Sequence, residues 1–322
     1  MTAADRARPR LLFINGFHRS GTTVMTSAVT EAVGGVTTTV GGLAAHIPPL
    51  HSFLAQTPAM GADRGADRLP VTPQTTEEYG FLLQQRTGSQ ALYRCPAGLS
   101  VLRSHIAELQ AQAPGQIVVL KNPWDTGDEA QLLADFPDAA IIMVRRRLAD
   151  MERSVRKALV RSSTSAYSRA LNGDASGYRR FQRQLASRWR RRLLLRALEL
   201  AGRRRVWRLA ARVRDLPPER VAFLSYDEMR ADPRTGAAWA AHLLDPQALA
   251  DAFADQAFAD AGTRAPSSVV HRALDRRWRA AWRDARARQM QAGIVGPPSP
   301  ARRAQDNGVR RRPDRELSVW GP

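Results

Sequence analysis

The chain has 322 residues, 43% of them apolar, which is enough for one large α/β domain with helical additions. Its one cysteine, Cys95, excludes an intramolecular disulfide, and no apolar run is long enough to cross a bilayer or to act as a signal peptide, so we expect a cytoplasmic protein. The formal net charge of +19 favours acidic partners, such as a nucleotide, an acidic acceptor, a nucleic acid or an anionic membrane surface.

The first predicted element is a buried strand from Leu11 to Ile14, followed by a turn over residues 16–23 and a helix over residues 22–32. A glycine-bounded turn between a strand and a helix N-terminus is a place to hold an anion. Its backbone N–H groups point inward, and the helix dipole adds partial positive charge. The hydroxyls of Ser20, Thr22 and Thr23 add further donors.

The spacing Gly16-x4-Gly21-Thr22-Thr23 is close to the phosphate-loop pattern of nucleotide-binding enzymes. The lysine expected after the second glycine is Thr22, and the cation of the loop is Arg19. This departure argues against an ordinary ATP or GTP site, where the lysine reaches the outer phosphates and Mg²⁺ is held nearby.

The next stretch is predicted to hold a short strand over 36–40 and then a turn-rich connection that carries His46 and His51. Residues 57–78 are rich in Pro, Gly and charge, and we interpret them as a mobile excursion. Helices are expected over 79–85 and 98–112.

Strands and helices alternate through the rest of the chain. Strands are predicted over 117–120, ending at Lys121, and over 139–144 and 221–224, and helices over 128–135, 148–160, 236–258 and 267–290. Residues 178–214 are a very basic helical region with an expected interruption near Gly202. We interpret this region first as a solvated face, with an acidic-acceptor or membrane-surface patch as the alternative.

The alternation predicts an α/β fold, a three-layer sandwich with a central parallel sheet of the P-loop type plus additional helices. We expect a single domain over residues 1–296 and a disordered tail over 297–322, which is rich in Pro, Arg and Gly.

The pattern G-x-x-R-S-G-T-T over 16–23 resembles the 5′-phosphosulfate-binding loop of the PAPS-dependent sulfotransferases, here the bacterial type of the P-loop sulfotransferase superfamily. Three further stretches resemble the same family in the right order: VVLKNP (118–123), FPDAAIIMVRRRLADMERS (136–154) and VAFLSYDEMRADP (221–233). The proline that follows the 3′-phosphate arginine in many members is absent, so the choice between Arg145 and Arg146 stays open. The C-terminal Arg-Lys-Gly nucleotide segment of the family is not recognisable.

The resemblance implies a sulfotransferase that moves a sulfuryl group from PAPS to a hydroxyl, or less favourably an amine, of a small-molecule acceptor, in line and without a metal. It implies a donor site formed by Gly16, His18, Arg19, Ser20, Gly21, Thr22, Thr23, Arg146 and Ser154. Peripheral membrane contact is compatible with it, and no nucleic-acid partner is expected.

Three residues are assigned to catalysis. Arg19 is assigned to the leaving phosphate and Lys121 to the sulfuryl oxygens. His46 is the preferred general base, because it follows the second strand, where related sulfotransferases place a catalytic carboxylate; His51 and His18 are the alternatives. The competing functions are a phosphate-loop kinase-like enzyme, which would need a loop lysine, and a basic nucleic-acid-binding protein, suggested by charge alone.

Overall fold

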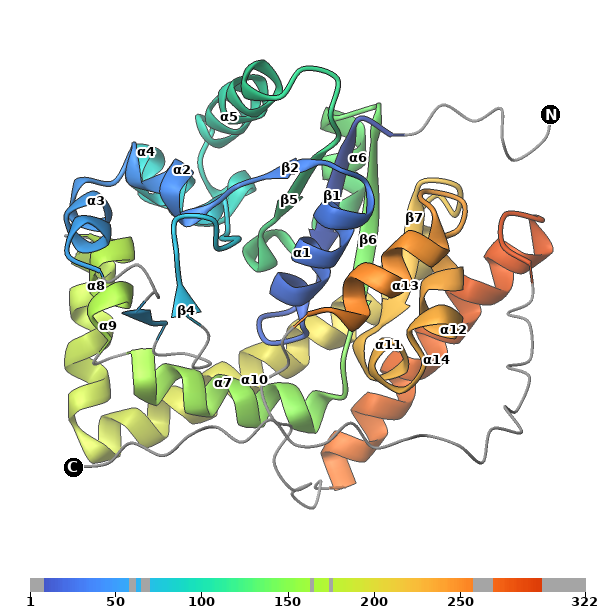
Figure 1. Cartoon of the computed structure of the whole chain (residues 1–322). Helices are drawn as coiled ribbons and strands as arrows, with labels where there is room; N and C mark the ends of the chain where they lie inside the picture. Colours follow the sequence, from blue (N-terminus) through green and yellow to red (C-terminus); the bar gives the residue numbers. More distant parts are fainter. Residues whose placement is uncertain are drawn as a thin grey trace, which may run out of the picture.

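The computed structural model describes residues 9–57, 62–64, 70–162, 165–173, 176–256 and 269–296. At its centre lies a five-stranded parallel sheet in the order β2-β5-β1-β6-β7 (Figure 1). The strands are β1 (Leu11–Asn15), β2 (Val36–Thr37), β5 (Val118–Lys121), β6 (Ala139–Arg145) and β7 (Val221–Ser225). All residues of the central three strands and of β7 are buried, which is why these strands consist of nearly continuous apolar runs in the sequence.

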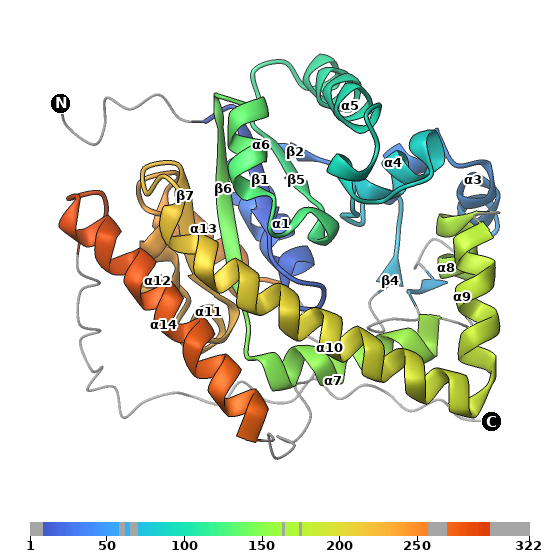
Figure 2. The ribbon, with the colours of Figure 1, turned by 180° about the vertical axis from the view of Figure 1, so that it is seen from behind.

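Helices cover both faces of this sheet (Figures 1 and 2). Alternate residues of β1 point to opposite faces, so Phe13 joins one core and Ile14 the other. The Ile14 face is covered by α1 (Thr22–Ala32), α11 (Tyr226–Ala231), α12 (Pro233–Ala237) and α13 (Pro246–Ala254). The Phe13 face is covered by α5 (Gly98–Gln112), α6 (Glu129–Asp135), the C-terminal half of α10 (Arg188–Arg212) and α14 (Val269–Gln291).

A third apolar core lies beside the sheet. It is formed by α2 (Val40–Ala44), α3 (Pro48–Ala55), α4 (Gly80–Thr87) and α8 (Ala166–Asn172), next to a short hairpin of β3 (Ala62–Asp63) and β4 (Pro70–Val71). Helices α7 (Leu148–Ser162) and α10 run along the lower side of Figure 1 between this lobe and the sheet, and α9 (Ser176–Ala186) precedes α10. Short 3₁₀ turns complete the chain: η2 (Leu92–Arg94), η3 (Pro123–Asp125), η4 (Val213–Asp215) and η5 (Ala238–Ala240).

The predicted α/β class, with a central parallel sheet between helical layers, is confirmed. Within the described residues, no helix combines the length and the apolar character needed to cross a membrane. The division into a domain over 1–296 and a tail stays a prediction, because residues 297–322 lie outside the described part of the chain. The same holds for mobility of the 57–78 excursion, of which 58–61 and 65–69 are not described.

Three local predictions were wrong, the first two because a helix cap was missed. The strand expected over 36–40 ends at Thr37, since the Thr39 side chain accepts a hydrogen bond from the Gly42 N–H at 3.1 Å and starts α2. The helix expected over 236–258 is divided, because Asp245 caps α13 and a proline occupies its first turn.

The third correction concerns the basic helical region. The helical region is interrupted at Ser187, whose backbone is extended (φ −88°, ψ 126°). Helix α10 then continues through Gly202 without interruption. One glycine inside a long helix costs only about 1 kcal/mol, which packing of its other residues readily offsets.

Candidate active site

The connection from β1 to α1 is a tight loop whose backbone only glycine can follow at two points. Gly21 has φ +97°, and a Cβ there would lie 2.2 Å from the Tyr226 ring. A Cβ on Gly16 would lie 2.6 Å from the carbonyl oxygen of Val144. Arg19 adopts a left-handed conformation (φ +70°) that non-glycine residues rarely take, so the loop directs this side chain at the expense of some backbone strain.

The loop is anchored to the connection that follows β5. The Thr126 hydroxyl accepts from the Gly16 N–H at 3.1 Å and donates to the Gly16 carbonyl at 2.9 Å. At the end of β1, the Asn15 side-chain amide donates to Glu129 at 3.2 Å. These contacts are buried, so the loop enters α1 from a fixed position.

Arg19, Ser154 and Arg146 meet around the loop, although they are far apart in the sequence. Arg19 Nε donates to Ser154 Oγ at 2.8 Å, and Arg146 Nη1 donates to the carbonyl oxygen of Arg19 at 3.3 Å. The Arg146 guanidinium also lies over the Tyr226 ring at 4.8 Å, the same ring that packs on Gly21. Two guanidinium groups and a hydroxyl therefore converge on one side of the cavity, as an anion site requires.

The structure brings Arg146, and not Arg145, to this cavity. Arg146 lines the cavity, and its Nε is buried without a hydrogen-bond partner. Arg145 lies in the sheet, where it donates to Ser225 Oγ at 3.3 Å and faces Glu228 at 3.8 Å.

Lys121 ends β5 and is fully buried beneath the loop. Its Nζ donates to Thr23 Oγ1 at 2.9 Å and lies 3.8 Å from Glu77 Oε1 and 3.7 Å from Glu78 Oε1. The cation is thus held between the first turn of α1 and two adjacent carboxylates.

These two carboxylates have opposite environments. Burial alone would raise the pKa of Glu77, but the charges of Arg64 and Lys121 and further hydrogen bonds outweigh it and hold the pKa below its ordinary value. Glu77 accepts a hydrogen bond from Arg64 at 2.7 Å and another from the Tyr167 hydroxyl at 2.6 Å. Burial raises the pKa of Glu78, and repulsion from Glu77 adds to this while Lys121 opposes it. Glu77 is therefore held in its ionised form, whereas burial disfavours the ionised form of Glu78.

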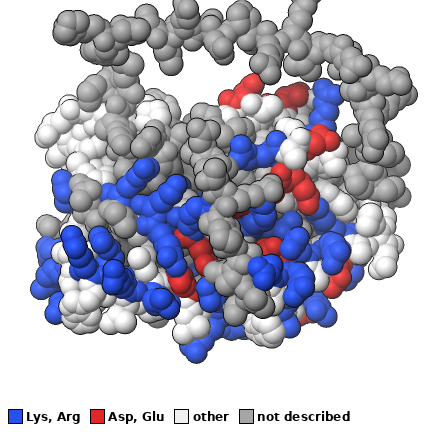
Figure 3. Space-filling view, turned by 90° about the horizontal axis from the view of Figure 1, so that it is seen from below, with Lys and Arg blue, Asp and Glu red and all other residues white. Residues whose placement is uncertain are grey.

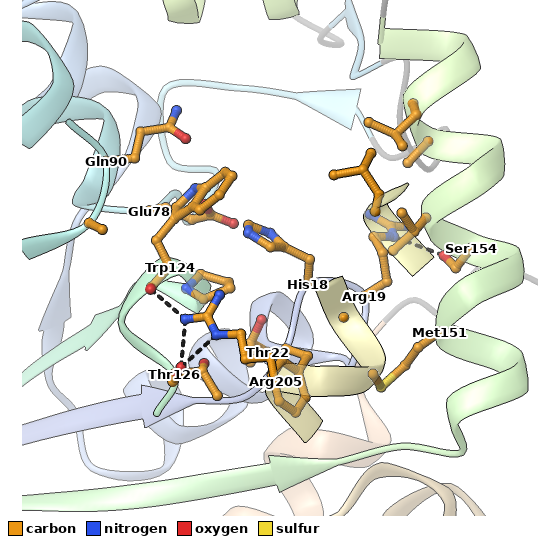
Figure 4. Close-up of a pocket in the computed structure, with 18 of the residues that line it drawn as sticks. His18, Arg19, Thr22, Glu78, Gln90, Trp124, Thr126, Met151, Ser154 and Arg205 are labelled. Atoms are coloured by element: carbon orange, nitrogen blue, oxygen red, sulfur yellow. Dashed lines mark hydrogen bonds between the residues drawn. The ribbon is translucent and has the colours of Figure 1, made fainter. Parts of the chain in front are cut away.

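Glu78, His18 and Trp124 project into the same space from three separate segments (Figure 4). The His18 and Trp124 rings meet edge to face with centroids 4.6 Å apart. Although the His18 side chain is partly exposed, its Nε2 is buried and has no hydrogen-bond partner. Burial, followed by the nearby charges of Arg205 and Lys121, lowers the pKa of His18 to about 3, so its imidazole is neutral near pH 7.

Arg205 of α10 fixes the turn that carries Trp124. Its guanidinium donates to the carbonyl oxygens of Trp124 and Thr126, as the dashed lines in Figure 4 show. A second buried contact holds the same turn, because Asp125 accepts from the Tyr79 hydroxyl at 2.6 Å and from the Asn122 amide at 2.7 Å. Burial raises the pKa of Asp125 to about 6.

Glu78, Trp124 and Arg205 face one cavity of about 1710 Å³, whereas Lys121 and Asp125 are not part of its lining. The loop residues His18, Arg19, Gly21, Thr22 and Thr23 line it together with Arg146 and Ser154, whereas Ser20 is buried behind it with a hydroxyl that has no partner. Apolar side chains from three helices complete the wall: Met151, Val155 and Leu159 of α7, Leu171 of α8, and Leu195 and Leu198 of α10.

The structure does not bring His46 together with this cavity. His46 lies at the end of α2 and lines a second cavity of about 610 Å³, with its Nε2 3.6 Å from Glu108 and its Nδ1 3.3 Å from Arg86. His51 is exposed on α3. Of the three histidines considered as a base, His18 is the one that faces the loop cavity.

Sequence reasoning missed Glu78, Trp124 and Arg205 as cavity residues. Glu78 stands at the end of a polar stretch interpreted as an excursion, and Arg205 is one of many arginines in the basic helical region. The position of Trp124 could have indicated a cavity residue, since it directly follows the strand-end residues Lys121-Asn122-Pro123. In the described part of the chain, no three His, Cys, Asp or Glu side chains are arranged to hold a metal ion.

The chain is similar in fold to two solved structures. The sulfotransferase STF1 of Mycobacterium tuberculosis H37Rv matches 86% of this chain and 78% of its own, with 15% identity and a TM-score of 0.49. The sulfotransferase STF9 of Mycobacterium avium matches 86% of this chain and 69% of its own, with 19% identity and a TM-score of 0.48. No curated protein matches the chain significantly. The sequence model of the sulfotransferase family matches residues 9–245, well over half of the chain, and the chain therefore belongs to the sulfotransferase family.

Proposed function

We propose that this sulfotransferase transfers a sulfuryl group from PAPS to a hydroxyl of a small-molecule acceptor, without a metal ion. The observation that carries the proposal is the convergence of two anion-binding groups on one cavity. Arg19 of the β1–α1 loop and Arg146 after β6 both line it, and the two strands are neighbours in the sheet. PAPS carries charge at two separate places, the 5′-phosphosulfate and the 3′-phosphate, and so needs two such groups.

The hydrogen-bond donors that line the cavity fit PAPS. The loop offers backbone N–H groups at the N-terminus of α1, the hydroxyls of Thr22 and Thr23, and the Arg19 guanidinium. Arg146 Nε is buried without a protein partner, and a buried donor of this kind commonly has a ligand or water partner. We assign the loop to the 5′-phosphosulfate and Arg146 with Ser154 to the 3′-phosphate.

In the reaction, an acceptor oxygen forms a bond to sulfur as the bond between sulfur and the bridging oxygen breaks. The electron pair of the broken bond stays on the phosphate, where charge grows, and the acceptor proton must be taken up by the protein. We assign Arg19, which donates to Ser154, to the growing phosphate charge. We assign Lys121, which reaches the cavity through its contact with Thr23, to the sulfuryl oxygens, so that both cations stabilise charge that develops in the transition state.

We assign the general base to Glu78, in place of His46. Glu78 faces the loop cavity, its ionised form is held near Lys121, and its raised pKa brings it closer to the working range of a base. His18 faces the same space, but its depressed pKa makes it a weak proton acceptor. It is better suited to hold the acceptor oxygen by a hydrogen bond.

The acceptor is proposed to lie between His18, Trp124 and the apolar side chains of α7 and α10. This wall suits a molecule with an apolar body and one reacting hydroxyl. The identity of the compound is best found by screening hydroxylated acceptors with PAPS and measuring PAP release.

The test of donor class is thermal denaturation with PAP, with ATP and Mg²⁺, and with an oligonucleotide. We expect PAP at micromolar concentration to raise the melting temperature, because binding to the native state alone stabilises by about 2.7 kcal/mol at one hundred times the dissociation constant. An equal shift with ATP and Mg²⁺, or a shift with the oligonucleotide alone, would contradict the proposal.

A further inference from the structure

The long helix α10 has apolar side chains on two opposite faces. Its inner face contributes Leu195 and Leu198 to the cavity wall and Val206 and Leu209 to the core. At about 100° per residue, its outer face carries Trp189, Leu193, Leu200 and Trp207 within roughly 40° of one another. These four are among the most exposed large apolar side chains of the described residues, at 61%, 61%, 51% and 51%.

We name Trp189, Leu193, Leu200 and Trp207 the outer stripe. Its members recur at intervals of four and seven residues over about 27 Å at 1.5 Å per residue, with Arg196 and Arg204 between them. The fold uses the inner face for packing and leaves the outer stripe in contact with water. A row of exposed large apolar side chains of this kind commonly marks an interaction surface.

The outer stripe is bordered by arginines. Arg192, Arg196 and Arg204 are exposed on the same side of the helix, and the one acid of α10, Glu199, instead pairs with Arg156 of α7. Each tryptophan lies against a guanidinium: Arg190 is 5.3 Å from the Trp189 ring, and Arg277 of α14 is 3.5 Å from the Trp207 ring. Basic side chains gather over the face seen from below, along which α7 and α10 run (Figures 1 and 3).

We propose that the outer stripe of α10 docks this protein on an anionic lipid surface. Tryptophan and leucine between rows of arginine match the boundary between lipid head groups and acyl chains, where the rings and apolar chains enter and the guanidinium groups meet phosphate. A second copy of the chain fits this face poorly, because a two-fold contact would place arginine rows against each other with no acid on the stripe to pair with them. The proposal is independent of the reaction assigned to the cavity.

The experiment is co-sedimentation of the full chain with vesicles of phosphatidylcholine alone and with vesicles of equal parts phosphatidylcholine and phosphatidylglycerol. We expect binding to the anionic vesicles, weakened by salt. The double substitution Leu193→Glu/Leu200→Glu should lower the partition coefficient by more than about tenfold, because both apolar groups are lost from the lipid phase. Arg196→Gln and Arg204→Gln should each weaken binding about fivefold.

Matched controls separate this effect from general changes in charge or folding. Met290→Glu replaces another exposed apolar residue, on α14, and Arg234→Gln removes an exposed arginine from α12; both should bind vesicles as the wild type does. Light scattering on the same proteins reports the oligomeric state. Equal pelleting with neutral vesicles, unchanged binding by Leu193→Glu/Leu200→Glu, or a dimer that this double substitution dissociates in the absence of vesicle binding would each overturn the proposal.

Discussion

Replacing Arg19 by glycine should lower kcat by about two to three orders of magnitude, the usual cost of removing one fixed donor from the site where transition-state charge develops. Arg19 lines the cavity beside the N-terminus of α1 and is oriented by the hydrogen bond from its Nε to Ser154. Glycine is preferred to alanine for this test, because residue 19 has φ +70°, and glycine removes the guanidinium without retaining the strain of that conformation. The measurement is steady-state PAP release with an acceptor found by screening.

One further variant and one binding measurement sharpen the result for Arg19. Ser154→Ala keeps the guanidinium but removes the hydroxyl that accepts from it, so we expect a smaller loss in kcat than for Arg19→Gly. PAP titration should show that Arg19→Gly still folds and still binds nucleotide. If kcat stayed within a few-fold of the wild-type value while PAP still bound, the role assigned to Arg19 would be wrong.

Glu78→Gln is the second substitution with a large expected effect, a loss of about 10²–10⁴ in kcat, since the amide cannot take up the acceptor proton. The base must be ionised to act, so kcat of the wild type should fall as the pH is lowered through the pKa of Glu78. This fall in kcat forms the acid limb of the pH profile. Because burial raises the pKa of Glu78, the acid limb should lie above the pH at which an ordinary glutamate titrates. In Glu78→Gln the limb should disappear together with most of the rate.

The comparison variant for the base is His46→Ala. His46 lies in the second cavity beside Glu108, away from the loop, so its removal should leave kcat and its pH profile unchanged. Glu77→Gln is unsuitable as a control, because Glu77 is an ionised partner of Arg64 and Tyr167 and its loss would disturb the fold. A normal pH profile in Glu78→Gln, or loss of the acid limb in His46→Ala, would return the role of base to His46.

The strands and the loop could be predicted from the sequence because their signals are local. Leu11–Asn15 and Ala139–Arg145 are apolar runs of the length expected for buried strands, and the glycine spacing of the loop directly reflects backbone needs that the structure shows at Gly16 and Gly21. The choice between Arg145 and Arg146 could not be made this way. Adjacent residues at a strand end point in opposite directions, and the two arginines are chemically identical, so only the fold shows that Arg145 lies beside Ser225 while Arg146 lines the cavity.

Glu78 could not be found from the sequence for a related reason. The charge environment of Glu78 depends on Lys121 and Glu77, and Lys121 lies more than forty residues further along the chain. The sequence offers two adjacent glutamates with nothing to separate them, whereas the fold gives Glu77 three hydrogen-bonding partners and leaves Glu78 facing the cavity. His46 was preferred because it follows a strand, but the chain forms α2 after Thr39 and carries His46 to the other cavity.

The central claim is that the cavity holds a nucleotide charged at two positions without a metal. It is tested most directly by calorimetric titration of the protein with PAP and with AMP in the presence of EDTA. The proteins compared are the wild type, Arg146→Gln and the neighbouring control Arg147→Gln; Arg147 pairs with Asp150 and does not itself line the cavity. We predict that the wild type and Arg147→Gln bind PAP at least about tenfold more tightly than AMP, the worth of one charge-assisted contact, and that Arg146→Gln loses this preference. Equal affinity of the wild type for PAP and AMP, or binding that appears only with Mg²⁺, would contradict it.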